Sequence, residues 1–544
     1  MHNKKVLYAC IWVLFIIYLF SFLFTTSNDF SQDLGRHIKL GEIIVQTKSV
    51  PKINLFSFTN PNFSFINHHW FSEVIFFLSQ KWMGLTSLIV LKTVVVGLSL
   101  VIAASTSGSL WGVAVGFLLS PLILERADIR PEIFGFLFFS LLLFQLKRLK
   151  KGKHISPFVP VIFLLWVNMH ISFVFGLFLL GIIFLVADKG KWNTVITLLS
   201  FLCLFINPNG VGGVLAPFTI FNNYGYSIVE NQNIFFLQSR TSDIFIKGFF
   251  LSLPFVLGAL YFLCRKKDYA GSLLLCVFTS LTFFQVRHFP FFIITALVFI
   301  PDALKSLKIH FGLTTKALLC YSFIILLFCG IVFFGTNMFF ETFDINKAFG
   351  TDFTLSNKKI FFYLKQNPPK GNIFNNFDIG SYLIYGLYPD MKVFVDGRPE
   401  AYPASFFQNI YIPIEEDEKM QERYFKQYDI HTVIVSHTDQ TPWGQTFLAR
   451  IARDKRWKMT YVDSTFVFFT DTKNAIDIRT TDRYIELAEE ENDFFKLASY
   501  IHFFEVIGKQ DVSISLLKKM NTLRPSACSL IRMHSMQNDS PWCY

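Results

Sequence analysis

The sequence predicts an α-helical polytopic membrane protein with about eleven transmembrane helices, followed by a C-terminal soluble α/β domain and a terminal helical hairpin. Composition is the first reason: 52% of the 544 residues are hydrophobic and 16% are charged, whereas a soluble domain carries roughly 25% charged residues. Second, long apolar runs recur through residues 1–335. Third, residues 336–480 instead alternate helix-like and strand-like runs, a pattern typical of a small α/β fold.

Each apolar run is interpreted as one spanning helix, and the first is expected to be retained. Residues 6–24 follow a basic start, and no small-residue cleavage site comes after them, which favours a membrane helix over a signal peptide. The amphipathic stretch 71–82 is expected to lie along the membrane surface. The predicted spans are 6–24, 85–105, 110–124, 132–147, 157–168, 171–187, 193–206, 248–264, 270–284, 288–301 and 316–335.

The charge distribution predicts the orientation. The net charge is +11, but residues 336–544 hold 24 Lys and Arg against 27 Asp and Glu, so the excess lies in short loops of the membrane part. This pattern follows the positive-inside rule and argues against a nucleic-acid partner. We therefore expect a multi-pass protein of the cell (inner or plasma) membrane, with a cytoplasmic N-terminus and an external or periplasmic C-terminal domain. The basic loops 147–154, 188–191, 265–268 and 302–308 all fall on the predicted cytoplasmic side.

The transmembrane part is predicted to cover residues 1–335, and two units follow it. Residues 336–480 are expected to form the α/β domain, with a parallel or mixed sheet. There the triplet "DGR" (396–398) follows a predicted strand, a position that suits either a ligand or an ordinary turn. Residues 481–544 are expected to be helical, and 497–527 resemble one tetratricopeptide-type hairpin. One copy cannot form a solenoid, so we expect a docking hairpin or a cap.

Ionisable side chains gather on the predicted external face. The long first loop (25–84) contains the stretch "SQDLGRHIKLGE" (31–42) directly after the first span. Asp33 has two interpretations: it caps a helix, or it is a general base for a hydroxyl acceptor. Arg36 and His37 could hold that carboxylate ionised, or they could extend along the membrane interface as snorkelling side chains.

Cationic residues beside several spans are candidate phosphate ligands. Arginine presents a planar fork of donors that matches phosphate oxygens, although contact with lipid head groups would place the same residues there. His170 lies between two apolar runs, where it is either a hydrogen-bonded structural residue or part of the same cavity. The cationic candidates are Arg126, Arg130, Arg287 and His288.

No cofactor is predicted. The sequence contains no CxxC pair or His/Cys cluster with the spacing of zinc ligands. His68 and His69 are metal-capable, but adjacent histidines rarely bind the same ion, so a divalent metal is a minority alternative. Cys528 and Cys543 could form a disulfide if the tail lies outside the cytoplasm, and two cysteines are a weak signal for one.

Several motifs, taken in order, resemble a large group of prokaryotic membrane proteins. The first is "DLGRHIKLGEIIVQTKSVPKINLFSFTNPNFSFINHHWFSEV" (33–74), which contains Asp-x-x-x-His-x-x-x-Gly-Glu and then His-x-Trp-x-x-Glu. The others are "RPEIFGFLFF" (130–139), "WVNMHISFVFGLFLLG" (166–181), "NPNG" (207–210), "RHFPFF" (287–292) and "IFNNFDIGSYLIYGLYPDMKVFVDGRPEAY" (373–402). On these residues the chain resembles the GT-C superfamily of integral membrane glycosyltransferases.

The resemblance implies a polyprenyl-phosphate sugar donor, an active site on the external face and a catalytic carboxylate in the long first loop. That carboxylate would be Asp33, with Asp29 as the second candidate. Asn67 departs from the group, which has Asp at this place before the His-x-Trp motif. The candidate substrate- and phosphate-binding residues are Arg36, His37, His69, Glu73, Arg126, Arg130, His170, Arg287 and His288.

These features predict a membrane glycosyltransferase that moves a sugar from a polyprenyl-phosphate carrier to a glycan, lipid or protein acceptor outside the membrane. The alternative is a non-enzymatic membrane scaffold or assembly protein whose external domain binds a partner. A lipid-linked saccharide transporter is less favoured, because transporters place ionisable groups near the bilayer midplane. Here the predicted spans carry almost none, with Lys92 as the main exception.

Overall fold

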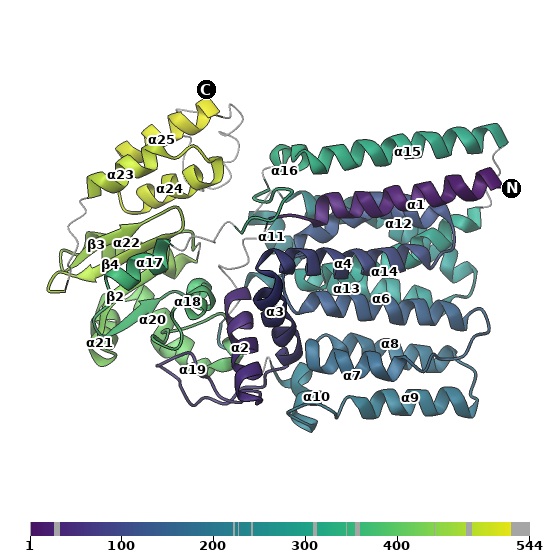
Figure 1. The fold of residues 1–544 in the computed structure, drawn as a ribbon, viewed down its shortest axis with the longest axis horizontal. Helices are drawn as coiled ribbons and strands as arrows, with labels where there is room; N and C mark the ends of the chain where they lie inside the picture. The colour runs from purple at the N-terminus through teal and green to yellow at the C-terminus, as the bar shows by residue number, and fades with distance from the viewer. Residues whose placement is uncertain are drawn as a thin grey trace.

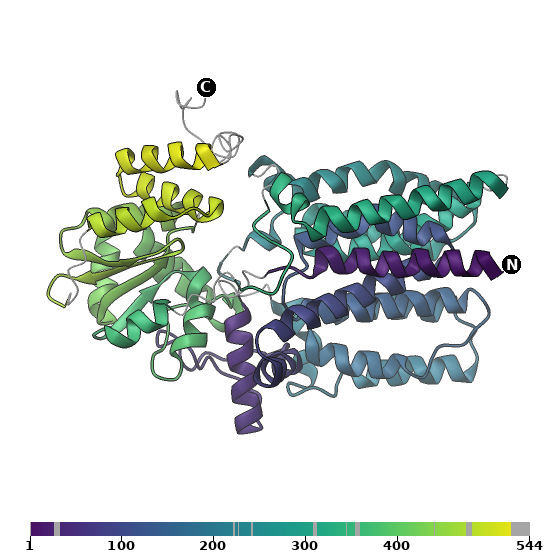
Figure 2. The same ribbon diagram turned by 45° about the horizontal axis from the view of Figure 1, so that its top comes forward.

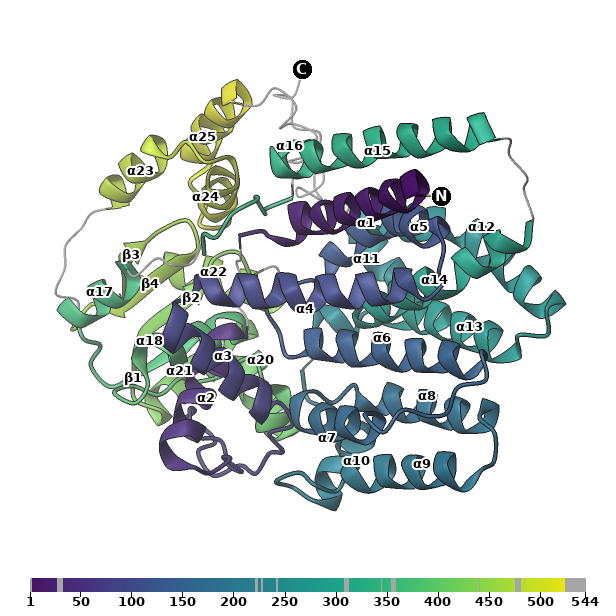
Figure 3. The ribbon, with the colours of Figure 1, turned by 45° about the vertical axis from the view of Figure 1, so that its right-hand side comes forward.

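The chain forms a long helical bundle with a C-terminal domain at one end (Figure 1). The helices of the bundle run roughly along the long axis of the molecule, and α1 begins at the end far from the C-terminal domain. Two helices of the long first loop, α2 (Leu34–Thr47) and α3 (Trp70–Met83), lie between the bundle and the C-terminal domain (Figures 1 and 3). The computed structural model describes residues 2–26, 33–220, 224–226, 228–240, 243–307, 313–343, 345–353, 359–439, 441–474 and 481–523.

The bundle is assembled around α14, which is buried along almost its whole length and packs against α4, α5, α6, α12 and α13. Its helices are α1 (His2–Leu23), α4 (Thr86–Ser105), α5 (Leu110–Leu119), α6 (Glu132–Leu149), α7 (Val159–Met169), α8 (Phe173–Val186), α9 (Lys191–Cys203), α10 (Val211–Thr219), α11 (Ile234–Arg240), α12 (Ile244–Arg265), α13 (Tyr269–Phe284), α14 (Phe289–Leu304), α15 (Leu313–Gly335) and α16 (Met338–Thr342). Short 3-10 turns join some of them: η2 (Ser120–Glu125), η4 (Val229–Asn231), η5 (Val286–His288) and η6 (Lys305–Leu307).

The apolar helices make this a multi-pass membrane protein, but the predicted count of eleven spans is not confirmed. Several predicted spans fold as helices too short to cross a bilayer alone: α7 has 11 residues and therefore rises roughly 17 Å, against a hydrocarbon core of about 30 Å. Among the described residues, the helices long and apolar enough to span are Lys5–Leu23, Thr86–Ser105, Ile244–Arg265, Val286–Leu307 and Leu318–Gly335. Shorter apolar helices are Leu110–Glu125, Val159–Met169, Phe173–Val186 and Tyr269–Phe284.

Two glycines of α2 allow this helix to sit against both of its neighbours. A Cβ on Gly41 would lie 2.0 Å from the backbone oxygen of Glu73 on α3. A Cβ on Gly35 would lie 2.5 Å from the backbone oxygen of Ser381 in the C-terminal domain. Because only glycine permits these approaches, the sequence of α2 determines how closely the long first loop joins the two parts of the molecule.

The C-terminal domain contains a mixed sheet of order β1-β2-β4-β3, in which only the β1–β2 pair is parallel. Alternate residues of β4 face two different cores: Phe466 and Phe468 join the core that continues from the bundle, whereas Val467 and Phe469 face a second core. Its elements are α17 (Lys359–Gln366), β1 (Asn372–Asn375), η7 (Phe377–Ile379), α18 (Gly380–Leu387), η8 (Pro399–Ala401), α19 (Ala404–Phe406), the π-helical turn η9 (Phe407–Tyr411), α20 (Ile412–Glu416), α21 (Glu418–Gln427), β2 (Ile430–Ser436), α22 (Pro442–Arg453), β3 (Trp457–Val462) and β4 (Phe466–Asp471).

The prediction of a strand directly before "DGR" is wrong. Residues 391–395 are not part of the sheet, because their bridge partner lies in the long first loop. Val393 forms an isolated parallel bridge with Ser57 of the long first loop. The Ser57 hydroxyl donates to the carbonyl oxygen of Phe394 at 3.1 Å, and the Thr59 hydroxyl donates to the same oxygen at 2.9 Å. The extended pattern of residues 391–395 therefore serves to join the C-terminal domain to the long first loop.

The helical hairpin packs onto the C-terminal domain, as Figure 2 shows. It consists of α24 (Phe494–Val506) and α25 (Gln510–Leu523), preceded by α23 (Thr481–Glu490). Gly508 provides the turn with φ of 82°, and Phe503 packs at 4.9 Å from the ring of His437. The hairpin shares the second core of the sheet. Cys528 and Cys543, the two cysteines considered for a disulfide, lie outside the described residues.

Candidate active site

Asp33 lies immediately before α2, but its side chain does not cap that helix. Its Oδ1 instead accepts hydrogen bonds from Arg36, at 2.9 Å from Nη2 and 3.3 Å from Nε. Burial raises the pKa of the Asp33 carboxyl, but Arg36 and then Arg130 outweigh this effect and bring the pKa to about 2. Asp33 is therefore ionised at neutral pH.

A group of histidines lies beside Asp33 where α2 packs on α3. His37 Nδ1 is 2.9 Å from Glu73 Oε1, and the amide of Asn67 donates to Glu73 Oε2 at 2.7 Å. The ring of His69 lies 5.4 Å from that of His37 and 5.3 Å from that of His170. Burial lowers the pKa of His37 and lowers those of His69 and His170 well below the usual value, so these imidazoles are neutral.

Three of these side chains have the geometry to hold a divalent cation. One donor atom from each of His37, His69 and Glu73 lies within 4.8 Å of the others. Neutral imidazole and carboxylate are ligands that zinc accepts. The sequence offered no such motif, because His37 and Glu73 stand 36 positions apart. Both oxygens of Glu73 already have partners in His37 and Asn67, so the cluster is also a satisfied hydrogen-bond network without an ion.

Three arginines converge on Glu230 of η4. Arg126 Nη1 lies 2.8 Å from Glu230 Oε1, Arg130 forms an ion pair with the same oxygen, and Arg287 Nη2 is 3.8 Å from Oε2. Arg126 also pairs with Glu132 at 2.8 Å. Because Arg126 and Arg130 are only 6% and 8% exposed, they form a desolvated cationic site whose counter-ion is the Glu230 side chain.

These groups line one cavity of about 310 Å³ at the end of the bundle that faces the C-terminal domain. His288 closes one side, where its ring meets that of Phe175 at 5.2 Å. Its buried Nδ1 has no hydrogen-bond partner among the described residues. The predicted residues that line the cavity are Asp33, Arg36, His37, His69, Arg126, Arg130, His170, Arg287 and His288.

One other predicted residue is not among those that line the cavity, and several lining residues were not predicted. Glu73 sits behind His37, and Asp29 lies outside the described residues. One signal for the missed acids was available: the tripeptide Arg-Pro-Glu occurs at 130–132 and 398–400, and the glutamate of each copy lines the cavity. The lining residues that sequence reasoning missed include Glu132, Tyr224, Glu230, Gln285 and Glu400.

Lys92, the main ionisable residue within the predicted spans, is not among the cavity-lining residues. Its Nζ donates to the Thr25 hydroxyl at 3.2 Å. This contact ties α4 to the segment after α1 and gives Lys92 a structural role.

No family model and no curated protein matches this sequence. The structure, however, is similar to that of the archaeal oligosaccharyltransferase AglB from Archaeoglobus fulgidus in complex with an inhibitory peptide and a dolichol-phosphate. The TM-score is 0.57 at 9% identity, over 98% of this chain and 87% of that one. The apo form of the Archaeoglobus fulgidus enzyme gives a TM-score of 0.56 at 10% identity, over 82% of this chain and 72% of that one.

The arabinofuranosyltransferase AftD from Mycobacteria is also similar, with a TM-score of 0.51 at 12% identity. The match covers 87% of this chain but 40% of that protein. Both neighbours are GT-C glycosyltransferases. The chain therefore has the GT-C fold, as its motifs predicted, and identities this low establish the fold alone.

Proposed function

We propose that this protein is a membrane glycosyltransferase that moves a sugar from a polyprenyl-phosphate carrier to an acceptor hydroxyl on the external face of the membrane. The observation that carries the proposal is the cavity. It brings an ionised carboxylate, Asp33, together with the buried Arg126 and Arg130 of one loop and the partly exposed Arg287 of η5. Transfer from a lipid phosphate needs these two kinds of group: one for the acceptor hydroxyl and one for the leaving phosphate.

In the proposed reaction, the acceptor oxygen attacks the anomeric carbon while the bond from that carbon to the phosphate oxygen breaks. The phosphate leaves with the electron pair and is stabilised by Arg126, Arg130 and Arg287. The hydroxyl proton passes to Asp33. A carboxyl with a pKa of about 2 is a weak base, so proton transfer follows formation of the new bond, and Asp33 first orients the hydroxyl. A single displacement inverts the anomeric configuration.

Glu230 occupies the proposed phosphate site in the structure. A donor phosphate would have to replace its carboxylate at Arg126 and Arg130. This exchange of one anion for another would keep the buried arginines paired throughout, which avoids the large cost of an uncompensated buried charge.

Donor turnover tests the proposal. Purified full-length protein in lipid nanodiscs is offered a panel of polyprenyl-phosphate sugars with a cell extract as the source of acceptors, and release of polyprenyl phosphate is measured. Asp33→Asn should abolish turnover. The control is Asp268→Asn. Asp268 lies between α12 and α13, at the ends of these helices that are far from the cavity, and pairs with Lys150, so this variant should retain turnover. If the wild type turned over none of the donors, this result would contradict the proposed glycosyltransferase activity and favour the alternative of a non-enzymatic scaffold protein.

A further inference from the structure

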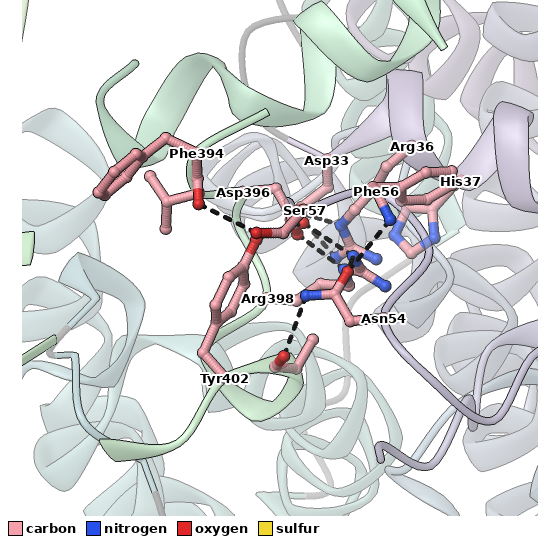
Figure 4. Close-up of polar contacts among 12 residues, drawn as sticks. Asp33, Arg36, His37, Asn54, Phe56, Ser57, Phe394, Asp396, Arg398 and Tyr402 are labelled. Atoms are coloured by element: carbon pink, nitrogen blue, oxygen red, sulfur yellow. Dashed lines mark hydrogen bonds and ion pairs between the residues drawn. The ribbon is translucent and has the colours of Figure 1, made fainter. Parts of the chain in front are cut away.

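A buried ion pair fastens one loop of the C-terminal domain to the long first loop. Asp396 and Arg398 are 0% and 1% exposed. Arg398 donates from Nε and Nη2 to the two carboxylate oxygens of Asp396, at 2.7 Å each. The same Nη2 donates to Asn54 Oδ1 at 2.9 Å, and the Asn54 amide donates to the carbonyl oxygen of Ala401 at 3.1 Å (Figure 4). Each loop thus donates one hydrogen bond to the other, across 344 and 347 positions of sequence.

Aromatic rings complete the enclosure of Arg398. Its guanidinium carbon lies 5.2 Å from the ring centre of Phe56 and 4.9 Å from that of Phe65, both in the long first loop. The hydroxyl of Tyr402 donates to Asp396 Oδ2 at 2.9 Å. A buried ion pair alone is weak evidence for stabilisation. A guanidinium held by a bidentate carboxylate and two rings, however, permits one orientation, which makes it suited to positioning.

The residues beside Arg398 form part of the cavity wall. Gly397 and Glu400 both line the cavity that holds Asp33 and Arg36. Glu400 belongs to η8, the short turn that begins directly after Arg398. The loop that Arg398 holds therefore places the Glu400 carboxylate at the cavity. This group comes from the C-terminal domain, whereas the bundle and the long first loop supply the other charged groups of the cavity.

The geometry points to Glu400 as a further sugar-binding residue, with Asp396 and Arg398 as the positioning pair that holds it at the cavity. This inference rests on the proposed glycosyltransferase function. A carboxylate accepts hydrogen bonds from hydroxyl groups, and the donor's sugar is the polyhydroxylated part of the substrate. With the phosphate at the arginines and the anomeric carbon near Asp33, the sugar hydroxyls lie within the same cavity, where Glu400 accepts from them.

Two lipids separate a sugar contact from a phosphate contact. The dissociation constants of undecaprenyl phosphate and of undecaprenyl-phosphate hexoses are measured on the full chain in nanodiscs. Glu400→Ala should weaken binding of the sugar-bearing lipid roughly tenfold or more and leave undecaprenyl phosphate unchanged. Arg398→Lys loses the bidentate fork, and Tyr402→Phe loses one hydrogen bond to Asp396. Both variants should also bind the sugar-bearing lipid more weakly relative to undecaprenyl phosphate, and the effect of Tyr402→Phe should be the smaller one.

The control is Arg456→Lys, an exposed arginine of the same domain that pairs with Glu418 and Asp454 and should change neither constant. Equal binding of both lipids by Glu400→Ala and the wild type would overturn the sugar contact. Equal loss for both lipids in Arg398→Lys and Tyr402→Phe would overturn the positioning role, because it would reveal a general folding defect. Failure of the wild type to bind either lipid would instead refute the proposed function itself.

Discussion

Replacing Glu230 by glutamine should strengthen the binding of polyprenyl phosphate. Glu230 accepts one hydrogen bond from Arg126 Nη2, at 3.1 Å from Oε2, and one from Arg130, and its Oε1 forms an ion pair with Arg126 Nη1 at 2.8 Å. Hydrogen bonds to a charged group contribute about 1.5–3 kcal/mol each. Two of them would oppose an incoming phosphate by about 3 kcal/mol, or roughly a hundredfold in affinity.

Two effects reduce this figure. The glutamine oxygen still accepts one hydrogen bond, and the Glu230 side chain is 21% exposed, so solvent screens part of its charge. We expect the dissociation constant for polyprenyl phosphate to fall about tenfold. The melting temperature of the lipid-free variant should also fall, because Arg126, Arg130 and Arg287 lose their shared counter-ion.

The assay is calorimetric titration of polyprenyl phosphate into protein in nanodiscs, together with thermal unfolding with and without that lipid. The lipid should raise the melting temperature more in Glu230→Gln than in the wild type, because it then supplies the missing anion. Glu42→Gln, which alters an ion pair with Lys39, is the matched control. An unchanged or weaker affinity in Glu230→Gln would refute the assignment of the phosphate site to these arginines.

Two further predictions concern α2. Arg36→Gln should raise the pKa of Asp33, because the effect of burial is then opposed by less positive charge. The acid limb of the pH–rate profile should therefore move to higher pH. An acid limb that does not move would argue against Asp33 as the titrating group. In the wild type the folded pKa of about 2 lies below the usual 3.8, so the stabilisation due to Asp33 is complete above about pH 4 and is lost as pH falls towards 2. Gly41→Ala should destabilise the protein by about 1–3 kcal/mol, because the new methyl group meets the backbone of Glu73. Gly181→Ala, where a Cβ would meet no heavy atom within 4 Å, should leave the melting temperature unchanged, and equal melting temperatures for both variants would contradict the close approach.

Most of the cavity's cationic wall could be predicted from sequence, because each residue lies at the end of an apolar run. Arg126, Arg130, Arg287 and His288 all follow or precede such a run, and helices that cross a bilayer bring alternate ends to the same face. Glu230 lies in a longer segment without strong periodicity, so no local pattern indicated that it would enter the arginine cluster. The two arginines that donate hydrogen bonds to it, Arg130 and Arg126, stand 100 and 104 positions away.

The length of the spans was less predictable than their existence. Hydropathy identifies an apolar run but does not show where the helix breaks. The run 157–168 was expected to span, yet α7 comprises 11 residues and ends before His170. The His170 ring nitrogen and the Ser172 hydroxyl lie 2.7 Å apart, and this turn brings His170 to the cavity.

By itself, the sequence determined the class of the protein: a multi-pass helical membrane part with its reactive groups near one set of helix ends, and an α/β domain after it. These features depend on composition, periodicity and loop charge, which are properties of neighbouring residues. Only the tertiary structure decided which side chains meet. The His37–Glu73 pair depends on the close packing of α2 on α3, and the Arg398–Asn54 contact joins segments 344 positions apart. Such contacts arise from the packing of whole elements, and the local pattern around each residue carries no record of a partner so distant in the chain.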